Sequence, residues 1–139
     1  MSKVSLRKTT GDVHVIFERA EDNSYIHAQW IGLQTLDSVK QGALYYVQML
    51  KEQPCPCLLN DHKELIGPWD VANDWIVSIW TPTVRSLGLR YLAQVLAPGI
   101  YGQMSFTQLH QRIDNQFEIK LFDNIEPALQ WLQESRLTI

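Results

Sequence analysis

The residues best suited to chemistry are Asn60-Asp61-His62, which follow the apolar run Cys57-Leu58-Leu59. A histidine beside an aspartate is a pairing used in general acid–base catalysis, and the thiol of Cys57 is a candidate nucleophile. Adjacent residues rarely direct their side chains at one another, however, and Cys57 lies inside a predicted strand. The polar residues can equally satisfy loop backbone groups and cap the next helix. An enzyme that uses Asp61 and His62 is therefore the function we favour least, and we expect no catalytic residues.

The position of Asn60, Asp61 and His62 favours binding over catalysis. They are predicted to form a polar loop at the carboxyl end of a parallel strand, which is where open α/β sheets bind ligands. Trp69 begins the following helix and can supply an aromatic wall, whereas the helical spacing of Trp75 and Trp80 is more typical of core residues. The candidate ligand- or partner-binding residues are Asn60, Asp61, His62, Trp69, Trp75 and Trp80.

Two kinds of binding site fit this region. A small apolar or anionic ligand needs a pocket against the tryptophans. A protein partner needs a flat apolar patch near Ile66, Trp69 and the outer face of the helix that follows. We favour the module that binds a regulatory protein, and the carrier of a small ligand is the alternative.

The two cysteines, Cys55 and Cys57, do not form a recognisable site. Side chains two residues apart in an extended chain point the same way and cannot easily form an unstrained disulfide. The spacing also differs from the Cys-x-x-Cys of redox and zinc sites, and His62 is the one nearby third ligand. We predict two reduced, mostly buried thiols, no metal and no cofactor.

His14 and His27 are predicted to share one face of a hairpin with Gln29. Two histidines on one sheet face are compatible with a metal or acid–base site. We favour the alternative, in which they lie on a partly exposed sheet surface or in a subunit contact.

The composition indicates one globular domain. The chain has 139 residues, of which 45% are hydrophobic, so it can bury one core. Its net charge of -3, without a dense basic run, argues against a nucleic-acid partner. The sequence has neither a signal peptide nor a membrane-spanning run, so we expect a cytoplasmic protein that does not insert into membranes.

The order of predicted elements indicates an α/β fold with a mixed sheet of about five strands and crossover helices. A turn centred on Glu21-Asp22 would pair Val13 with Trp30. Thr35 is a helix cap, Pro82 is expected to kink or divide a helix, and Gly88 to end it. The predicted strands are 13–17, 25–30, 57–60, 89–96 and 117–122, and the predicted helices are 36–52, 68–87, 101–113 and one that follows Asp123-Asn124.

Short motifs rich in Trp, Gly and Pro occur along nearly the whole chain. They are Trp30-Ile31-Gly32, Leu59-Asn60-Asp61, Gly67-Pro68-Trp69, Asn73-Asp74-Trp75, Trp80-Thr81-Pro82, Gly88-Leu89-Arg90-Tyr91-Leu92-Ala93, Phe122-Asp123 and Ala128-Leu129-Gln130-Trp131-Leu132. With these motifs the sequence resembles the small, stand-alone bacterial STAS-like family that is common in Bacteroidetes. That family is related in fold to the sporulation anti-anti-sigma factor and to CRAL-TRIO lipid-binding proteins.

The resemblance implies a STAS-like fold without known catalytic residues. It also implies a role in docking regulatory partners or in holding small apolar or anionic ligands. Anti-sigma antagonists carry a phosphorylated Ser or Thr after the third strand, but residues 60–72 contain neither, which disfavours that switch. We therefore predict a non-catalytic regulatory or protein-interaction module that self-associates, with a homodimer as the expected form.

Overall fold

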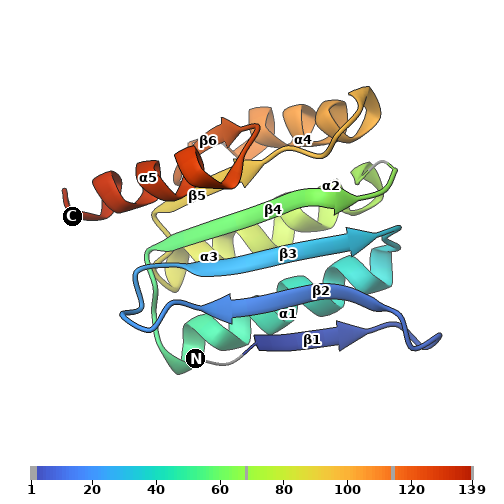
Figure 1. The fold of residues 1–139 in the computed structure, drawn as a ribbon, viewed down its shortest axis with the longest axis horizontal. Helices are drawn as coiled ribbons and strands as arrows, with labels where there is room; N and C mark the ends of the chain where they lie inside the picture. The colour runs from blue at the N-terminus through green and yellow to red at the C-terminus, as the bar shows by residue number, and fades with distance from the viewer. Residues whose placement is uncertain (1–2, 68, 114, 139) are drawn as a thin grey trace.

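The computed structural model describes residues 3–67, 69–113 and 115–138. The predicted place of Pro68 in the first turn of a helix lies outside the described residues. Six strands form one sheet in the order of the sequence (Figure 1). Strands β1 to β3 are antiparallel, and β3 to β6 are parallel. Their bounds are β1 Lys3–Arg7, β2 Val13–Arg19, β3 Ile26–Gly32, β4 Cys57–Leu65, β5 Tyr91–Val95 and β6 Glu118–Phe122.

Helices cover the two faces of the sheet unequally. Helix α1 (Leu36–Glu52), helix α3 (Thr81–Ser86) and helix α4 (Ile100–Ile113) lie behind the sheet in Figure 1, and α5 (Ile125–Arg136) lies in front. The main core joins the sheet to the helices behind it, and a smaller apolar cluster joins β4 and β5 to α5. The front face of β1 to β3 is therefore left without a covering helix (Figure 1).

Helix α1 begins and ends where the sequence predicts. The Thr35 hydroxyl accepts a hydrogen bond from the Ser38 amide, and the Ser38 hydroxyl is bonded in return to the Thr35 amide, so both free backbone donors are satisfied. In the middle of the helix, Gly42 lies against the indole of Trp30, where a β-carbon would come within 2.4 Å of the ring. This glycine lets α1 approach the sheet closely.

Strand β1 was not predicted from the sequence. Val4 and Leu6 alternate with Lys3, Ser5 and Arg7, which is the pattern of a half-buried edge strand. The strand is only five residues long, and its signal is correspondingly weak. With it, the sheet has six strands rather than about five.

The predicted hairpin register is wrong by two residues. Val15, not Val13, pairs with Trp30, because the turn lies further along the chain than Glu21-Asp22. The same residues still face the core, since a shift of two preserves the alternation. The prediction for His14 is also wrong: it lies at an irregularity between β1 and β2 that turns it inward, where it is fully buried and hydrogen bonded to Gln41. His14 and His27 therefore do not share a face.

The helix predicted around the tryptophans is one continuous but irregular segment, residues 70–86, which we call the α2–α3 segment. It begins as a 3₁₀ turn (Asp70–Ala72), continues through α2 (Asn73–Trp75) and a π-helical turn (Ile76–Trp80), and ends as α3. Pro82 lacks an amide hydrogen, and its ring clashes with an α-helical carbonyl four residues earlier. The π turn, in which the Thr81 amide bonds to the Ile76 carbonyl, widens the helix just before this proline.

Candidate functional site

The predicted polar loop is part of a strand. Strand β4 continues through Asn60, Asp61 and His62 to Leu65, whereas its pairing with β5 ends at Asp61 and Val95. These residues are level with the carboxyl end of β5, but they lie inside β4 and not in a polar loop at its end, so this part of the prediction is wrong. Because neighbouring side chains in a strand point to opposite faces, Asn60 and His62 lie on the side of the main core and Asp61 lies on the side that carries α5. Asp61 and His62 consequently cannot act together as an acid–base pair.

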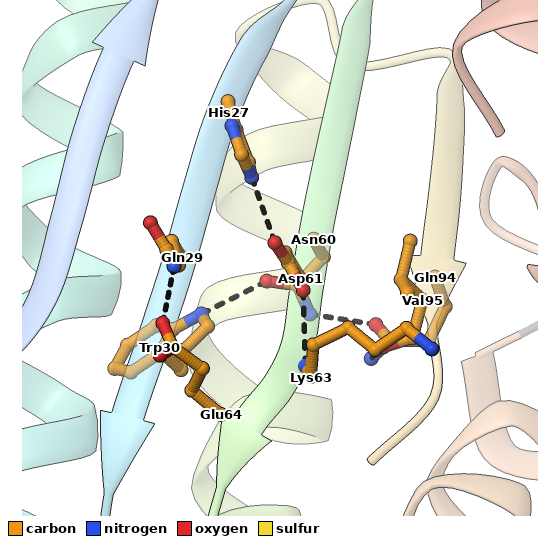
Figure 2. Close-up of polar contacts among 9 residues, drawn as sticks. All are labelled: His27, Gln29, Trp30, Asn60, Asp61, Lys63, Glu64, Gln94 and Val95. Carbon is orange, nitrogen blue, oxygen red and sulfur yellow. Dashed lines mark hydrogen bonds and ion pairs between the residues drawn. The ribbon is translucent and has the colours of Figure 1, made fainter. Parts of the chain in front are cut away.

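Asn60 is the centre of a buried polar network (Figure 2). Its Oδ1 accepts a hydrogen bond from Trp30 Nε1 at 2.9 Å, and its Nδ2 donates to Gln94 Oε1 at 2.7 Å. Gln94 is fully buried, so each bond satisfies a group that would be costly to leave unpaired. The network thus links the side chains of β3, β4 and β5 on the face of the sheet that packs against the main core.

His62 is a buried, neutral imidazole. Its ring lies 4.6 Å from the Trp69 ring and 6.1 Å from the Phe106 ring, measured between centroids. Burial lowers the pKa of His62 to about 3, although the nearby Asp61 carboxylate acts in the opposite direction. At neutral pH this histidine is a packing residue that bulk solvent does not reach.

Asp61 forms a second polar pair on the open face of the sheet (Figure 2). Burial would raise the pKa of its carboxyl, but hydrogen bonds from His27 and from the Lys63 amide hold the pKa below its ordinary value. Because an ionised carboxylate only accepts hydrogen bonds, His27 Nε2 donates to Asp61 Oδ2, at 3.0 Å. The amide of Lys63 donates to Oδ1 at 2.9 Å, beside the irregularity in the pairing of β3 with β4.

The pairing of His27 with Asp61 was missed by the sequence analysis. It depends on the parallel register of β3 and β4, which brings together side chains 34 residues apart. An oriented imidazole of this kind is compatible with acid–base chemistry. However, the described part of the chain has no group of three or more His, Cys, Asp or Glu side chains arranged to hold a metal ion.

Cys55 and Cys57 are both buried, as predicted.

The three candidate tryptophans have different environments. Trp69 is buried against Trp30, with the ring planes nearly perpendicular and the centroids 4.8 Å apart. Trp80 is also buried and donates its indole hydrogen bond to the Ala43 carbonyl of α1. Trp75 is only partly buried, and Lys40 Nζ lies 5.7 Å from the centre of its ring. Trp80 thus matches its predicted core role, Trp69 joins it in the core, and Trp75 reaches the surface.

Trp69, Trp80 and Asn60 line an apolar cavity between the sheet and its covering helices. Its free volume is about 40 Å³. That volume holds a few water molecules, whereas sites for small organic ligands occupy about 300–1,000 Å³. The cavity therefore does not hold a ligand of ordinary size in this conformation.

A stripe of apolar side chains lies on the outer side of the α2–α3 segment. Val71 and Ile79 are 57% and 50% exposed, and Trp75 lies between them in the sequence. The residues that follow each of them, Ala72, Ile76 and Trp80, are buried, so the stripe faces away from the core. Leu33 and Ile66 are each 61% exposed at the carboxyl ends of β3 and β4. We call Val71, Trp75, Ile79, Leu33 and Ile66 the docking stripe.

Leu33 and Ile66 belong to the same end of the molecule. The Ile66 amide bonds to the Gly32 carbonyl, and Leu33 Cδ2 lies 3.3 Å from where a β-carbon of Gly67 would stand. The sequence predicts that a protein-docking module would expose an apolar patch around Ile66 and the outer face of the helix, and several of these residues lie there. Trp69 is the exception, because it is buried beneath the surface.

Comparison with known proteins identifies the fold. No protein-family model matches the sequence, and no curated protein matches it. A solved structure of an uncharacterised protein from the DUF3478 family with a SpoIIAA-like fold, from Shewanella loihica PV-4, superposes with a TM-score of 0.58. The match covers 85% of this chain and 91% of that chain at 20% identity. The chain therefore has a SpoIIAA-like, or STAS-like, α/β fold, as predicted.

Within residues 3–67, 69–113 and 115–138, no helix combines the length and the apolar character needed to cross a membrane.

Proposed function

We propose that this chain is a non-catalytic regulatory module that binds another protein through the docking stripe. The observation that carries the proposal is the exposure of Val71 and Ile79 on the same side of one helical segment, in a molecule that also exposes Leu33 and Ile66 at the carboxyl ends of β3 and β4. Exposed apolar patches of this kind on a small domain mark interaction surfaces.

Two further observations support binding of a protein over the alternative functions. The interior cavity, with a free volume of about 40 Å³, is too small for the cargo of a carrier. The side chains of Asp61 and His62 are separated by the sheet, which disfavours an enzyme that uses the two together. Self-association is the competing way to cover the stripe, and a homodimer is also predicted from the sequence, without a surface assigned to it.

Native mass spectrometry of the chain, purified under gentle conditions from cells that naturally express it, tests the proposal. We expect a complex whose added mass is that of a second protein. An adduct of a few hundred daltons that disappears on denaturation would instead identify a carrier. A spectrum of monomers or homodimers alone, without a second protein, would contradict the proposal.

A further inference from the structure

A second pocket lies at the end of the sheet opposite to the docking stripe. Figure 1 shows that the turn between β2 and β3 and the last turn of α5 lie at this end of the molecule. The two segments line a pocket of about 290 Å³. That volume is close to the lower limit for small-molecule sites, about 300 Å³. The lining includes Asp22, Ser24 and Tyr25 from the turn and Leu129, Leu132 and Arg136 from α5.

Arg136 brings an unpaired guanidinium to this pocket. It lies in the last turn of α5, and its Nε is buried without a hydrogen-bond partner. The guanidinium makes no hydrogen bond or ion pair with any residue that the structure describes. Leaving a buried donor unpaired costs free energy, and the planar fork of guanidinium N–H groups matches the two oxygens of a carboxylate. A ligand carboxylate in the pocket would therefore satisfy Arg136.

Asp22 brings the opposite charge to the same pocket. Its Oδ1 accepts a hydrogen bond from the Ser24 amide at 3.0 Å. Hydrogen bonds from the Ser24 hydroxyl and amide, with a smaller effect of the Arg136 charge, lower the pKa of Asp22, so its carboxylate is ionised at neutral pH. Asp22 and Arg136 both line the pocket but do not form an ion pair with each other. Each charge is therefore left for a ligand.

The charges around the pocket balance. Arg19 and Glu21 are the other charged residues of the turn and its approach. Glu134 is bonded to Gln130 and lies on a different side of α5 from the residues that line the pocket. The two acidic and two basic residues of this region leave no net charge. A site of this kind does not select a simple anion or cation, and it favours a molecule that carries both charges.

The remaining walls of the pocket are apolar. Leu132 is buried, and Leu129 and Tyr25 are partly buried against the smaller core cluster. Apolar walls with a few placed polar groups are typical of sites for small molecules.

We infer that this pocket binds a free α-amino acid with an apolar side chain. Arg136 binds the carboxylate, and Asp22 accepts hydrogen bonds from the ammonium group. The side chain lies against Leu129, Leu132 and Tyr25. The inference goes beyond the proposed function, because the docking stripe lies at the other end of the sheet and takes no part in this site.

Nuclear magnetic resonance titration of the ¹⁵N-labelled chain tests the inference. The probes are L-leucine, leucinamide, which lacks the carboxylate, and 4-methylpentanoate, which lacks the ammonium group. The variants are Arg136→Gln and Asp22→Asn. The matched controls are Arg85→Gln, at an exposed arginine in the last turn of α3, and Glu21→Gln, at the exposed neighbour of Asp22.

We expect L-leucine to shift the amide signals of Ser24, Leu132 and Arg136 with a Kd of about 1 mM or tighter. Leucinamide and 4-methylpentanoate should each bind about tenfold more weakly, because each lacks one charge-assisted hydrogen bond. Arg136→Gln should weaken leucine binding about tenfold and Asp22→Asn several-fold, and both controls should bind as the wild type does. Asp22 is exposed, so its variant keeps the test valid even if Arg136→Gln perturbs the fold.

Three results would overturn the inference. The first is the absence of shifts at a leucine concentration of about 20 mM. The second is equal binding of leucine and 4-methylpentanoate, which would show a site for carboxylates alone. The third is equal binding of leucine to the wild type and Asp22→Asn. None of these results bears on the docking stripe, so the proposed function stands or fails separately.

Discussion

Asp61 is the residue on which several contacts of the open sheet face depend. The residue is 4% exposed, and its two carboxylate oxygens accept hydrogen bonds from His27 and from the Lys63 amide. Removing a buried carboxylate leaves both donors without this partner. The bond from Gln29 to Glu64 on the same face is exposed and can exchange with water.

We predict that Asp61→Ala lowers the free energy of unfolding by about 1–3 kcal/mol, because two charge-assisted hydrogen bonds are lost in a buried setting. Glu64→Ala, on the same strand, should change it by less than about 0.5 kcal/mol. Urea unfolding followed by circular dichroism measures both. Equal effects would show that the contacts of Asp61 contribute no more than those of an exposed residue.

His62 makes stability depend on pH. Its pKa is 6.5 in the unfolded chain and is lowered to about 3 in the folded chain, so the unfolded state binds the proton first. The stabilising contribution is complete above pH 6.5 and is lost as the pH falls from 6.5 towards 3. The pKa of Asp61 is also lowered in the folded chain, from 3.8 in the unfolded chain. Asp61 therefore adds a further loss of stability as the pH falls below 3.8.

Between pH 7 and pH 5 we expect His62 to remove about 2 kcal/mol from the free energy of unfolding. His62→Gln replaces the imidazole with a neutral side chain and should flatten this part of the profile. Chemical unfolding of both proteins at the two pH values gives the difference. Parallel profiles would mean that His62 does not titrate differently on folding.

At the residue scale, sequence alone picks out Asn60, Asp61 and His62 as polar residues that follow a buried apolar run. It assigns them to a loop, whereas they lie inside β4. The bond from His27 to Asp61 does not follow from the sequence, because it requires the register of two strands that are far apart in the sequence. The inward turn of His14 likewise depends on an irregularity in strand pairing, which a simple alternation cannot show.

At the element scale, Gly42 shows how packing overrides helix propensity. At an exposed position inside a helix, replacing Gly by Ala raises the free energy of unfolding by about 1 kcal/mol. Here the added methyl group would meet the Trp30 ring at 2.4 Å. That ring is held by Asn60 on one side and by Trp69 on another, so it cannot easily move.

We therefore predict that Gly42→Ala destabilises the chain by about 1–2 kcal/mol, the overpacking cost exceeding the gain in propensity. Gln48→Ala, at an exposed position of the same helix, should be close to neutral. Thermal and urea unfolding provide the comparison. A stabilised Gly42→Ala variant would contradict the close approach of α1 to the sheet.

The elements differ in how well sequence predicts them. The bounds of α1 follow from the Thr35 cap and a regular apolar spacing, and they are correct. The predicted end of β4 is wrong. Asp61 to Glu64 are polar residues that resemble a loop in sequence, but they remain in the strand because they pair with β3. The π turn of the α2–α3 segment is a response to Pro82 that sequence indicates only as a kink.

At the scale of the whole molecule, the order of strands and helices is enough to predict a mixed α/β sheet, whereas its STAS-like type is what the resemblance of the short motifs implies. The order of elements does not predict the unequal covering of the sheet, which depends on α5 packing against β4 and β5 alone. Nor does it separate a core tryptophan from a surface one. Trp69 and Trp75 have similar sequence contexts, and only tertiary packing buries the first and leaves the second in the docking stripe.

The proposed binding of another protein to the docking stripe is tested most directly by affinity purification. The tagged wild-type chain, Ile79→Asp and Leu137→Asp are purified from cells that naturally express the protein, and the recovered proteins are quantified by mass spectrometry. Leu137→Asp is the control, because it makes the same kind of change at an exposed residue after α5, outside the stripe. We predict at least one protein that is recovered equally with the wild type and Leu137→Asp, and at least tenfold less with Ile79→Asp. Recovery of the same proteins in the same amounts with all three chains would contradict the claim.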